Sequence, residues 1–67
     1  MDKEWIKVYS DTFEPKVEML RIQLQNDGIA ALVLNQKDSA HVHIGEVELF
    51  VKRDNVIRAK HLIESWS

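Results

Sequence analysis

A helix that ends at a glycine and is followed at once by an apolar strand is the feature that most constrains this chain. Apolar residues recur at helical spacing after Pro15, the sequence Asn-Asp-Gly follows at 26–28, and residues 30–35 have the apolar character of a strand. Just past a helix, glycine adopts a left-handed conformation without steric cost. We therefore predict that Gly28 ends the helix and that Ile29 folds back onto Leu24.

A first strand precedes this helix. Residues 5–10 alternate and are rich in aromatic and β-branched side chains, as is typical of a strand. Alternation places Ile6 and Val8 on one face of the strand. The residues expected on its other face are Trp5, Lys7 and Tyr9.

The helix itself has a clear start and a clear buried face. Ser10, Asp11 and Thr12 are cap-type residues, and Pro15 suits a first helical turn. The expected buried stripe is Val17, Leu20 and Leu24, flanked by Met19 and Ile22. The strand at 30–35 is apolar almost throughout, which resembles a strand covered on both sides.

Residues 45–51 show the strongest alternation in the chain. Their inward row is predicted to be Val47, Leu49 and Val51, and their outward row Glu46, Glu48 and Phe50. Asp54 is then expected to cap a last helix. The residues at helical spacing on one face of that helix are Val56, Ala59, Leu62, Ile63 and Trp66. Trp66 is expected to close the core, with contact to a partner subunit as the alternative.

The resulting order is β-α-β-β-α. A right-handed crossover places both helices on one face of a three-stranded sheet. We predict one α+β domain over residues 1–67, a two-layer α/β plait that is a truncated ferredoxin-like fold, with the third strand between the other two and no fourth strand. The first strand is then an open edge, and the face that carries Trp5, Tyr9 and Phe50 has no helix over it.

The composition and charge of the chain indicate which kinds of partner and site to expect. The chain has 67 residues, no cysteine and a formal net charge of −2 with mixed signs. A chain of this size buries only about 60% of its unfolded surface, and it lacks disulfides and cysteine-based zinc sites, so we expect a homo-oligomer. No signal peptide or apolar membrane span is recognisable, which predicts a cytoplasmic protein without membrane contact. The charge balance argues against a nucleic-acid partner.

Several segments together resemble a known family. These are residues 5–10, the helix led by Pro15, residues 26–30, and residues 45–51 with the alanine-bearing helix after them. They are similar to a small bacterial family of prokaryotic signal-transducing proteins, a domain of unknown function related in fold to the nitrogen-regulatory PII (GlnB-like) proteins. The resemblance implies a GlnB-like, ferredoxin-like fold and a role in signal transduction. PII proteins use a long loop between the second and third strands and clefts between subunits for nucleotide, whereas residues 36–42 form a short segment without a glycine-rich phosphate cradle.

Two histidines are the candidate metal ligands. His41 and His43 lie two apart, so in a strand both rings would point the same way, with Asp38 or His61 as a possible third ligand. A structural zinc site needs about four ligands and a catalytic site about three. A solvated loop is therefore the preferred interpretation, and we expect no metal and no other cofactor.

The remaining polar clusters do not indicate an enzyme. Ser10, Asp11 and Thr12 precede Pro15, and this position favours helix capping over nucleophilic catalysis. Glu46 and Glu48 share an open sheet face, where adjacent solvated carboxylates lack the separated pKa values that acid–base catalysis requires. We expect no catalytic residues.

A non-enzymatic interaction or regulatory module is therefore the preferred function. Its expected binding residues, for an unidentified protein or a second copy, are Trp5, Lys7, Tyr9, Glu46, Glu48 and Phe50. Two alternatives stay open, a PII-like sensor of a small ligand or nucleotide and an RNA-binding domain that stacks bases on its first and third strands. Glu46 and Glu48 would repel phosphates, which weighs against RNA. A purely structural interpretation is that Trp5 and Phe50 cover each other across neighbouring strands.

Overall fold

The computed structural model describes residues 4–36 and 46–66 of the chain. Its elements are β1 (Trp5–Asp11), α1 (Glu14–Asn26), β2 (Ala31–Gln36), β3 (Glu46–Lys52), the 3-10 turn η1 (Arg53–Asn55) and α2 (Val56–Trp66). The described part is a small α+β domain, and the predicted β-α-β-β-α order is confirmed.

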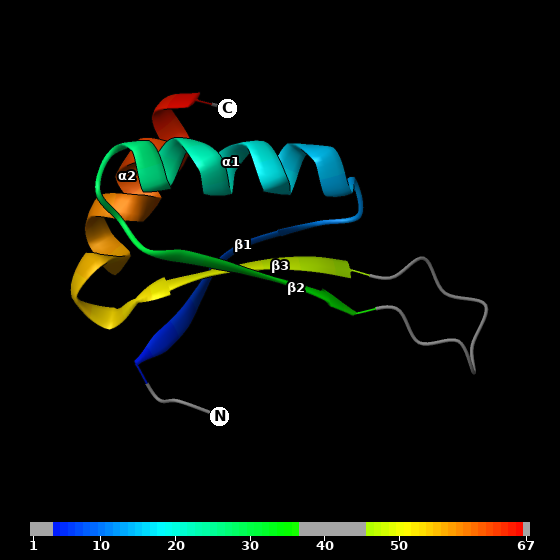
Figure 1. Ribbon diagram of the computed structural model, residues 1–67, viewed down its shortest axis with the longest axis horizontal. Coiled ribbons are helices and arrows are strands. Elements are labelled where there is room, and N and C mark those ends of the chain that lie inside the picture. Colours follow the sequence, from blue (N-terminus) through cyan, green and yellow to red (C-terminus); the bar gives the residue numbers. More distant parts are fainter. Residues whose placement is uncertain (1–3, 37–45, 67) are drawn as a thin grey trace.

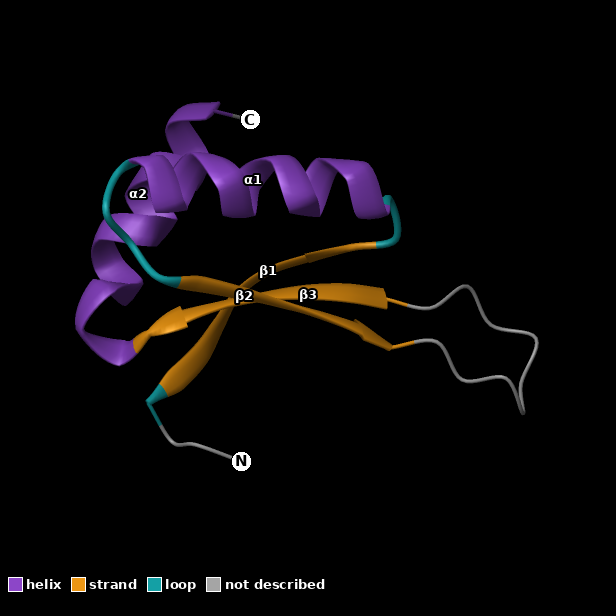
Figure 2. Ribbon diagram, in the orientation of Figure 1, coloured by secondary structure: helices purple, strands orange, loops and turns teal. Residues whose placement is uncertain are grey.

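The sheet has three strands in the order β1-β3-β2, and β3 is antiparallel to both neighbours. Figure 1 shows α1 and α2 on the same side of this sheet. Figure 2 shows the same two layers, with helices above and strands below. The opposite side of the sheet carries no helix within the described residues.

The core lies between these two layers. Val47, Leu49 and Val51 of β3 point into it with at most 2% of their surface exposed, as the alternation of this strand predicts. The buried residues that complete the core are Val17, Leu20, Leu24, Ile29, Ala59 and Ile63. The predicted inner row of β3 is therefore confirmed.

The end of α1 has the predicted geometry. Gly28 has a φ angle of 82°. The Ile29 N–H donates to the Leu24 carbonyl at 2.9 Å, and the Gly28 N–H donates to the Gln25 carbonyl at 3.0 Å. These two bonds define a Schellman motif. Leu24 and Ile29 are both buried in the same core, so the predicted return of Ile29 onto Leu24 is confirmed.

The outer surface of α1 differs from the prediction. Val17, Leu20 and Leu24 are buried as expected, but Met19 and Ile22 are 51% and 49% exposed. A helix turns about 100° per residue, which puts positions 19 and 22 on the side opposite Leu24. Met19 and Ile22 therefore lie on the solvent side of α1 and do not flank the core.

The last helix has the predicted buried face but a different start. Ala59 and Ile63 are buried, and Trp66 packs against the core with Val56 and Leu62. Asp54 was expected to cap this helix. It lies inside η1, whose N-cap is Lys52, and α2 follows that turn without a break. The predicted capping role of Asp54 is therefore wrong, because the chain enters α2 through a 3-10 turn.

Substitution of Gly28 tests the backbone geometry at the end of α1. A β-carbon there would meet no atom within 4 Å, so any cost comes from the left-handed conformation alone. We expect Gly28→Ala to lower the free energy of unfolding by about 1 kcal/mol and Gly28→Val by at least as much, whereas Gly28→Asn should cost less because asparagine tolerates this conformation. Urea unfolding of the three variants measures this, and equal stability of parent and Gly28→Val would contradict the assignment.

Candidate protein-binding face

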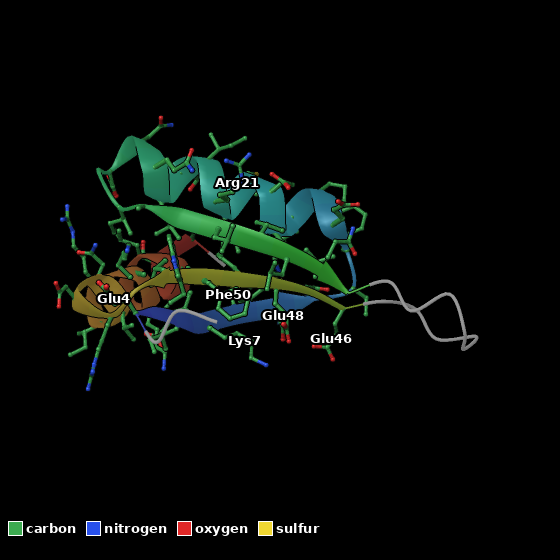
Figure 3. All side chains as sticks on the ribbon, turned by 60° about the horizontal axis from the view of Figure 1, so that its bottom comes forward. Glu4, Lys7, Arg21, Glu46, Glu48 and Phe50 are labelled. Atoms are coloured by element: carbon green, nitrogen blue, oxygen red, sulfur yellow. The ribbon has the colours of Figure 1, made fainter. Side chains whose placement is uncertain are left out.

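The strand register defines the surface opposite the helices, which we call the helix-free face. Directly paired residues of neighbouring strands point to the same side of a sheet. Phe50 pairs with Lys7 on β1 and with Leu32 on β2. The same pairing assigns to this face Trp5, Lys7, Ser10, Leu32, Leu34, Glu46, Glu48, Phe50 and Lys52. Figure 3 shows Lys7, Glu46, Glu48 and Phe50 on this side of the sheet and Arg21 on the helical layer.

Phe50 occupies the middle of the helix-free face but is not freely exposed. It lies between Lys7 and Leu32, with Trp5 as a diagonal neighbour across the strands. Only 8% of its surface is accessible. Its outward direction matches the prediction, and its low exposure agrees with the structural interpretation in which side chains of neighbouring strands cover it. Alternation along one strand cannot show how far the side chains of both neighbouring strands cover a central residue.

Leu32 and Leu34 lie on the helix-free face, which the sequence pattern did not predict. The apolar run of β2 resembles a strand covered on both sides, but the described helices cover only one face of the sheet (Figure 1). Leu32 pairs with Phe50 and Leu34 with Glu48, so both leucines face away from the helices. Leu32 is 38% exposed. The antiparallel pairing of β2 with the alternating strand β3 is the signal that could have assigned them.

Charged groups surround the apolar centre of the helix-free face. The Lys7 Nζ lies 3.3 Å from Glu48 Oε2. The Lys52 Nζ lies 4.9 Å from the centroid of the Trp5 ring and 3.8 Å from Glu4 Oε1. Ion pairs as exposed as these contribute about 0–1 kcal/mol each to stability, so their main effect is on the charge pattern of the surface.

Tyr9 does not belong to the helix-free face. The register shifts between Lys7 and Tyr9, so that Lys7 pairs with Phe50 and Tyr9 with Leu49. An extra residue in one strand reverses the alternation that follows it. Tyr9 thus lies on the side of Leu49 and packs against the core. The prediction that Tyr9 shares a face with Trp5 and Lys7 is wrong, because Val8 occupies a bulge.

Tyr9 instead takes part in the corner between β1 and α1. Asp11 Oδ2 accepts a hydrogen bond from the Tyr9 hydroxyl at 3.0 Å, and Asp11 Oδ1 accepts one from the Phe13 N–H at 3.1 Å. The Phe13 N–H and then the Tyr9 hydroxyl lower the pKa of Asp11. The Lys16 Nζ lies 5.6 Å from the centroid of the Tyr9 ring, and Tyr9 raises the pKa of Lys16.

This corner refines the predicted helix start. Pro15 lies in the first turn of α1, as expected, but the N-cap residue is Phe13 and its side chain makes no capping bond. Asp11 orders the turn from the end of β1. The predicted capping of α1 by residues 10–12 is therefore wrong, because Asp11 bonds to the Tyr9 hydroxyl and to the N–H of Phe13, which precede the first turn of the helix.

The described structure does not bring the candidate metal ligands together. Asp38, His41 and His43 lie outside the described residues, and His61 is exposed on α2. Within residues 4–36 and 46–66, no three His, Asp or Glu side chains are grouped so that they could hold a metal ion. The same part of the chain contains no enclosed pocket. Neither described helix is long and apolar enough to cross a membrane.

Comparison with known proteins adds no assignment. No family model, curated protein or solved structure matches this chain. The geometry defines the class, a small α+β domain with a three-stranded antiparallel sheet and two helices. The resemblance to the prokaryotic signal-transducing family stays a prediction.

The Asp11 corner predicts a specific loss of stability in acid. The pKa of Asp11 is lower in the folded chain than its ordinary value of about 3.9. The ionised carboxylate therefore stabilises the fold above that ordinary value, and the contribution is lost as the pH falls through the lowered pKa. We expect Asp11→Asn to be less stable than the parent at neutral pH and to lose less stability on acidification.

Urea unfolding at several pH values between neutral and about pH 2 checks this expectation. The matched control is Asp54→Asn, which removes one exposed carboxylate from η1. Parallel pH profiles for the parent and Asp11→Asn would contradict a stabilising role for the ionised Asp11.

Proposed function

We propose that this chain is a small non-enzymatic interaction module, and that it binds a protein through the helix-free face. The observation that carries the proposal is the composition of this face. A sheet surface without a helix over it in the described structure has an apolar centre, Phe50 and Leu32, between charged side chains such as Lys7 and Glu48. Protein interfaces commonly combine an apolar centre with a polar rim.

The exposed apolar residues outside the helix-free face are scattered over the helical layer and the turn before α1. Phe13 lies at the turn before α1, Met19 and Ile22 lie on the outside of α1, and Ile57 is 84% exposed on α2. Singly exposed apolar residues are normal on protein surfaces. Trp5, Leu32, Leu34 and Phe50 differ because three adjacent strands place them on one continuous surface. This continuity favours the helix-free face as the binding surface.

We further propose a ferredoxin-like fold of the GlnB-like type and a role in signal transduction. The order β1-β3-β2 with both helices on one face supports the fold, since it is the ferredoxin-like arrangement without its fourth strand. The signalling role rests on the family resemblance. RNA binding by the same face loses support, because Tyr9 points toward the helices while Glu46 and Glu48 stay on the face.

A charge placed at Leu32, beside Phe50 on the helix-free face, tests the proposal. Leu32→Glu should reduce capture of the partner from a lysate of the source cells by at least about tenfold, because a carboxylate would be buried in the interface. The matched control is Ile22→Glu, at a similarly exposed apolar residue on the outside of α1. Immobilised parent and variants are compared by quantitative mass spectrometry, with circular dichroism to verify folding.

The two variants distinguish the surfaces. A protein retained by the parent and by Ile22→Glu but lost from Leu32→Glu supports the proposal. Loss from Ile22→Glu with retention by Leu32→Glu would assign binding to the helical layer and overturn it.

A further inference from the structure

We infer that the partner of the helix-free face is a second copy of this chain, stacked face to face with its β3 antiparallel to the first. The inference rests on the proposed function, since it names the occupant of the same surface. It is carried by the distribution of charge along β3, together with the position of the apolar residues beside that strand.

Charge is polarised along the helix-free face. Glu46 and Glu48 lie in the first half of β3, and Lys52 is its last residue. Residues 46 and 52 are separated by about 20 Å along a strand. On β1, Lys7 lies level with Phe50 and therefore also in the half that contains Lys52. Along β3 itself the carboxylates thus lie toward one end and the ammonium group of Lys52 at the other, where Glu4 Oε1, just before β1, lies 3.8 Å from the Lys52 Nζ.

Symmetry allows two ways to stack this face on itself. A two-fold axis that brings two copies face to face must lie in the interface plane, and its two limiting directions are along β3 and across it. An axis along β3 keeps the strands parallel and places Glu46 over Glu46 of the second copy. An axis across the strands makes the two β3 strands antiparallel and places Glu46 over Lys52 of the second copy. The two-fold symmetry then also places Lys52 over Glu46 of the second copy. Charge complementarity therefore selects the antiparallel arrangement.

The same axis brings apolar residues together. This axis reverses the direction of the strands but keeps their order across the sheet. Each β2 therefore lies over β2 of the second copy. Leu32 pairs with Phe50, and Leu34 pairs with Glu48. If the axis crosses β3 midway between Glu48 and Phe50, Leu32 of one copy lies near Leu34 of the other. Packed sheets lie about 10 Å apart, a distance that a layer of such side chains fills. The leucines then form an apolar contact along the β2 edge of the interface, and on the central strand the same reversal sets Glu48 of one copy near Phe50 of the other.

A second copy fits this face better than an unrelated protein for a physical reason. A two-fold interface needs one patch that complements itself, so that every positive group has a negative counterpart on the same surface. Glu46 and Lys52 meet this requirement at opposite ends of β3, with Leu32 and Leu34 between their levels. A face with a single sign of charge would instead indicate a different partner of opposite charge.

Charge reversal tests the inference by sedimentation velocity over a concentration series. The parent should dimerise, and Lys52→Glu and Glu46→Lys should each weaken its dimer by at least about tenfold. An equimolar mixture of these two variants should dimerise again, because both charge contacts become attractive in the heterodimer. The double variant Glu46→Lys with Lys52→Glu should also recover. Matched controls with the same charge changes on the exposed side of α2 are Lys60→Glu and Glu64→Lys, which should leave the dimer unchanged.

Cross-linking tests the direction of stacking. The chain has no cysteine, so Glu46→Cys and Lys52→Cys introduce single reactive sites. With a short bismaleimide, the antiparallel dimer predicts efficient cross-links between the two variants in a mixture and weak cross-links within either variant alone. Efficient linkage of Glu46→Cys to itself would indicate the parallel arrangement and overturn the inferred geometry.

The outcomes separate this inference from the proposed function. A parent that stays monomeric at high micromolar concentration overturns the inference, and selective loss of a different protein from Leu32→Glu would then still support binding through the helix-free face. A parent dimer that resists both charge reversals and Leu32→Glu, but dissociates with Ile22→Glu, overturns both.

Discussion

Burial of the apolar row on β3 beneath two helices is the interaction on which the rest of this domain depends. Val47, Leu49 and Val51 are almost completely inaccessible, and β3 is also the strand that holds both others. Full burial of such side chains contributes about 1.5–3 kcal/mol each. A slip of one residue would move Glu46 and Glu48 under the helices. The same row therefore supplies stability and determines the register of the sheet.

The composition of the helix-free face follows from this register. With the valines and Leu49 turned inward, the alternate residues of β3 face outward, and direct pairing places Leu32 and Lys7 beside Phe50. The bulge at Val8 then removes Tyr9 from that side and joins it to the core. What is left is a surface with a modest apolar centre and charged side chains around it.

Polar contacts at the two ends of α1 orient the helical layer. Asn35 Nδ2 donates to Glu14 Oε2 at 3.1 Å, which joins the first turn of α1 to the end of β2. Arg58 Nη2 on α2 donates to the Asp27 carbonyl at 3.3 Å. α1 has no basic residue in its own last turn, and the Arg58 guanidinium supplies positive charge at the negative end of its dipole. The helices are thus held to each other and to the sheet at defined points.

The sequence by itself determined the features that depend on neighbouring residues. Gly28 ends α1, the alternation of β3 separates its two faces, and Ala59 lies on the buried stripe of α2, because backbone conformation and residue spacing are local properties. Only the tertiary structure decided the side of Tyr9 and the burial of Phe50. A bulge exists only relative to the strand that it pairs with, and the covering of Phe50 depends on neighbours more than 15 residues away in the chain. Most of the fold was therefore predictable, whereas the membership of the candidate binding face was set by strand pairing.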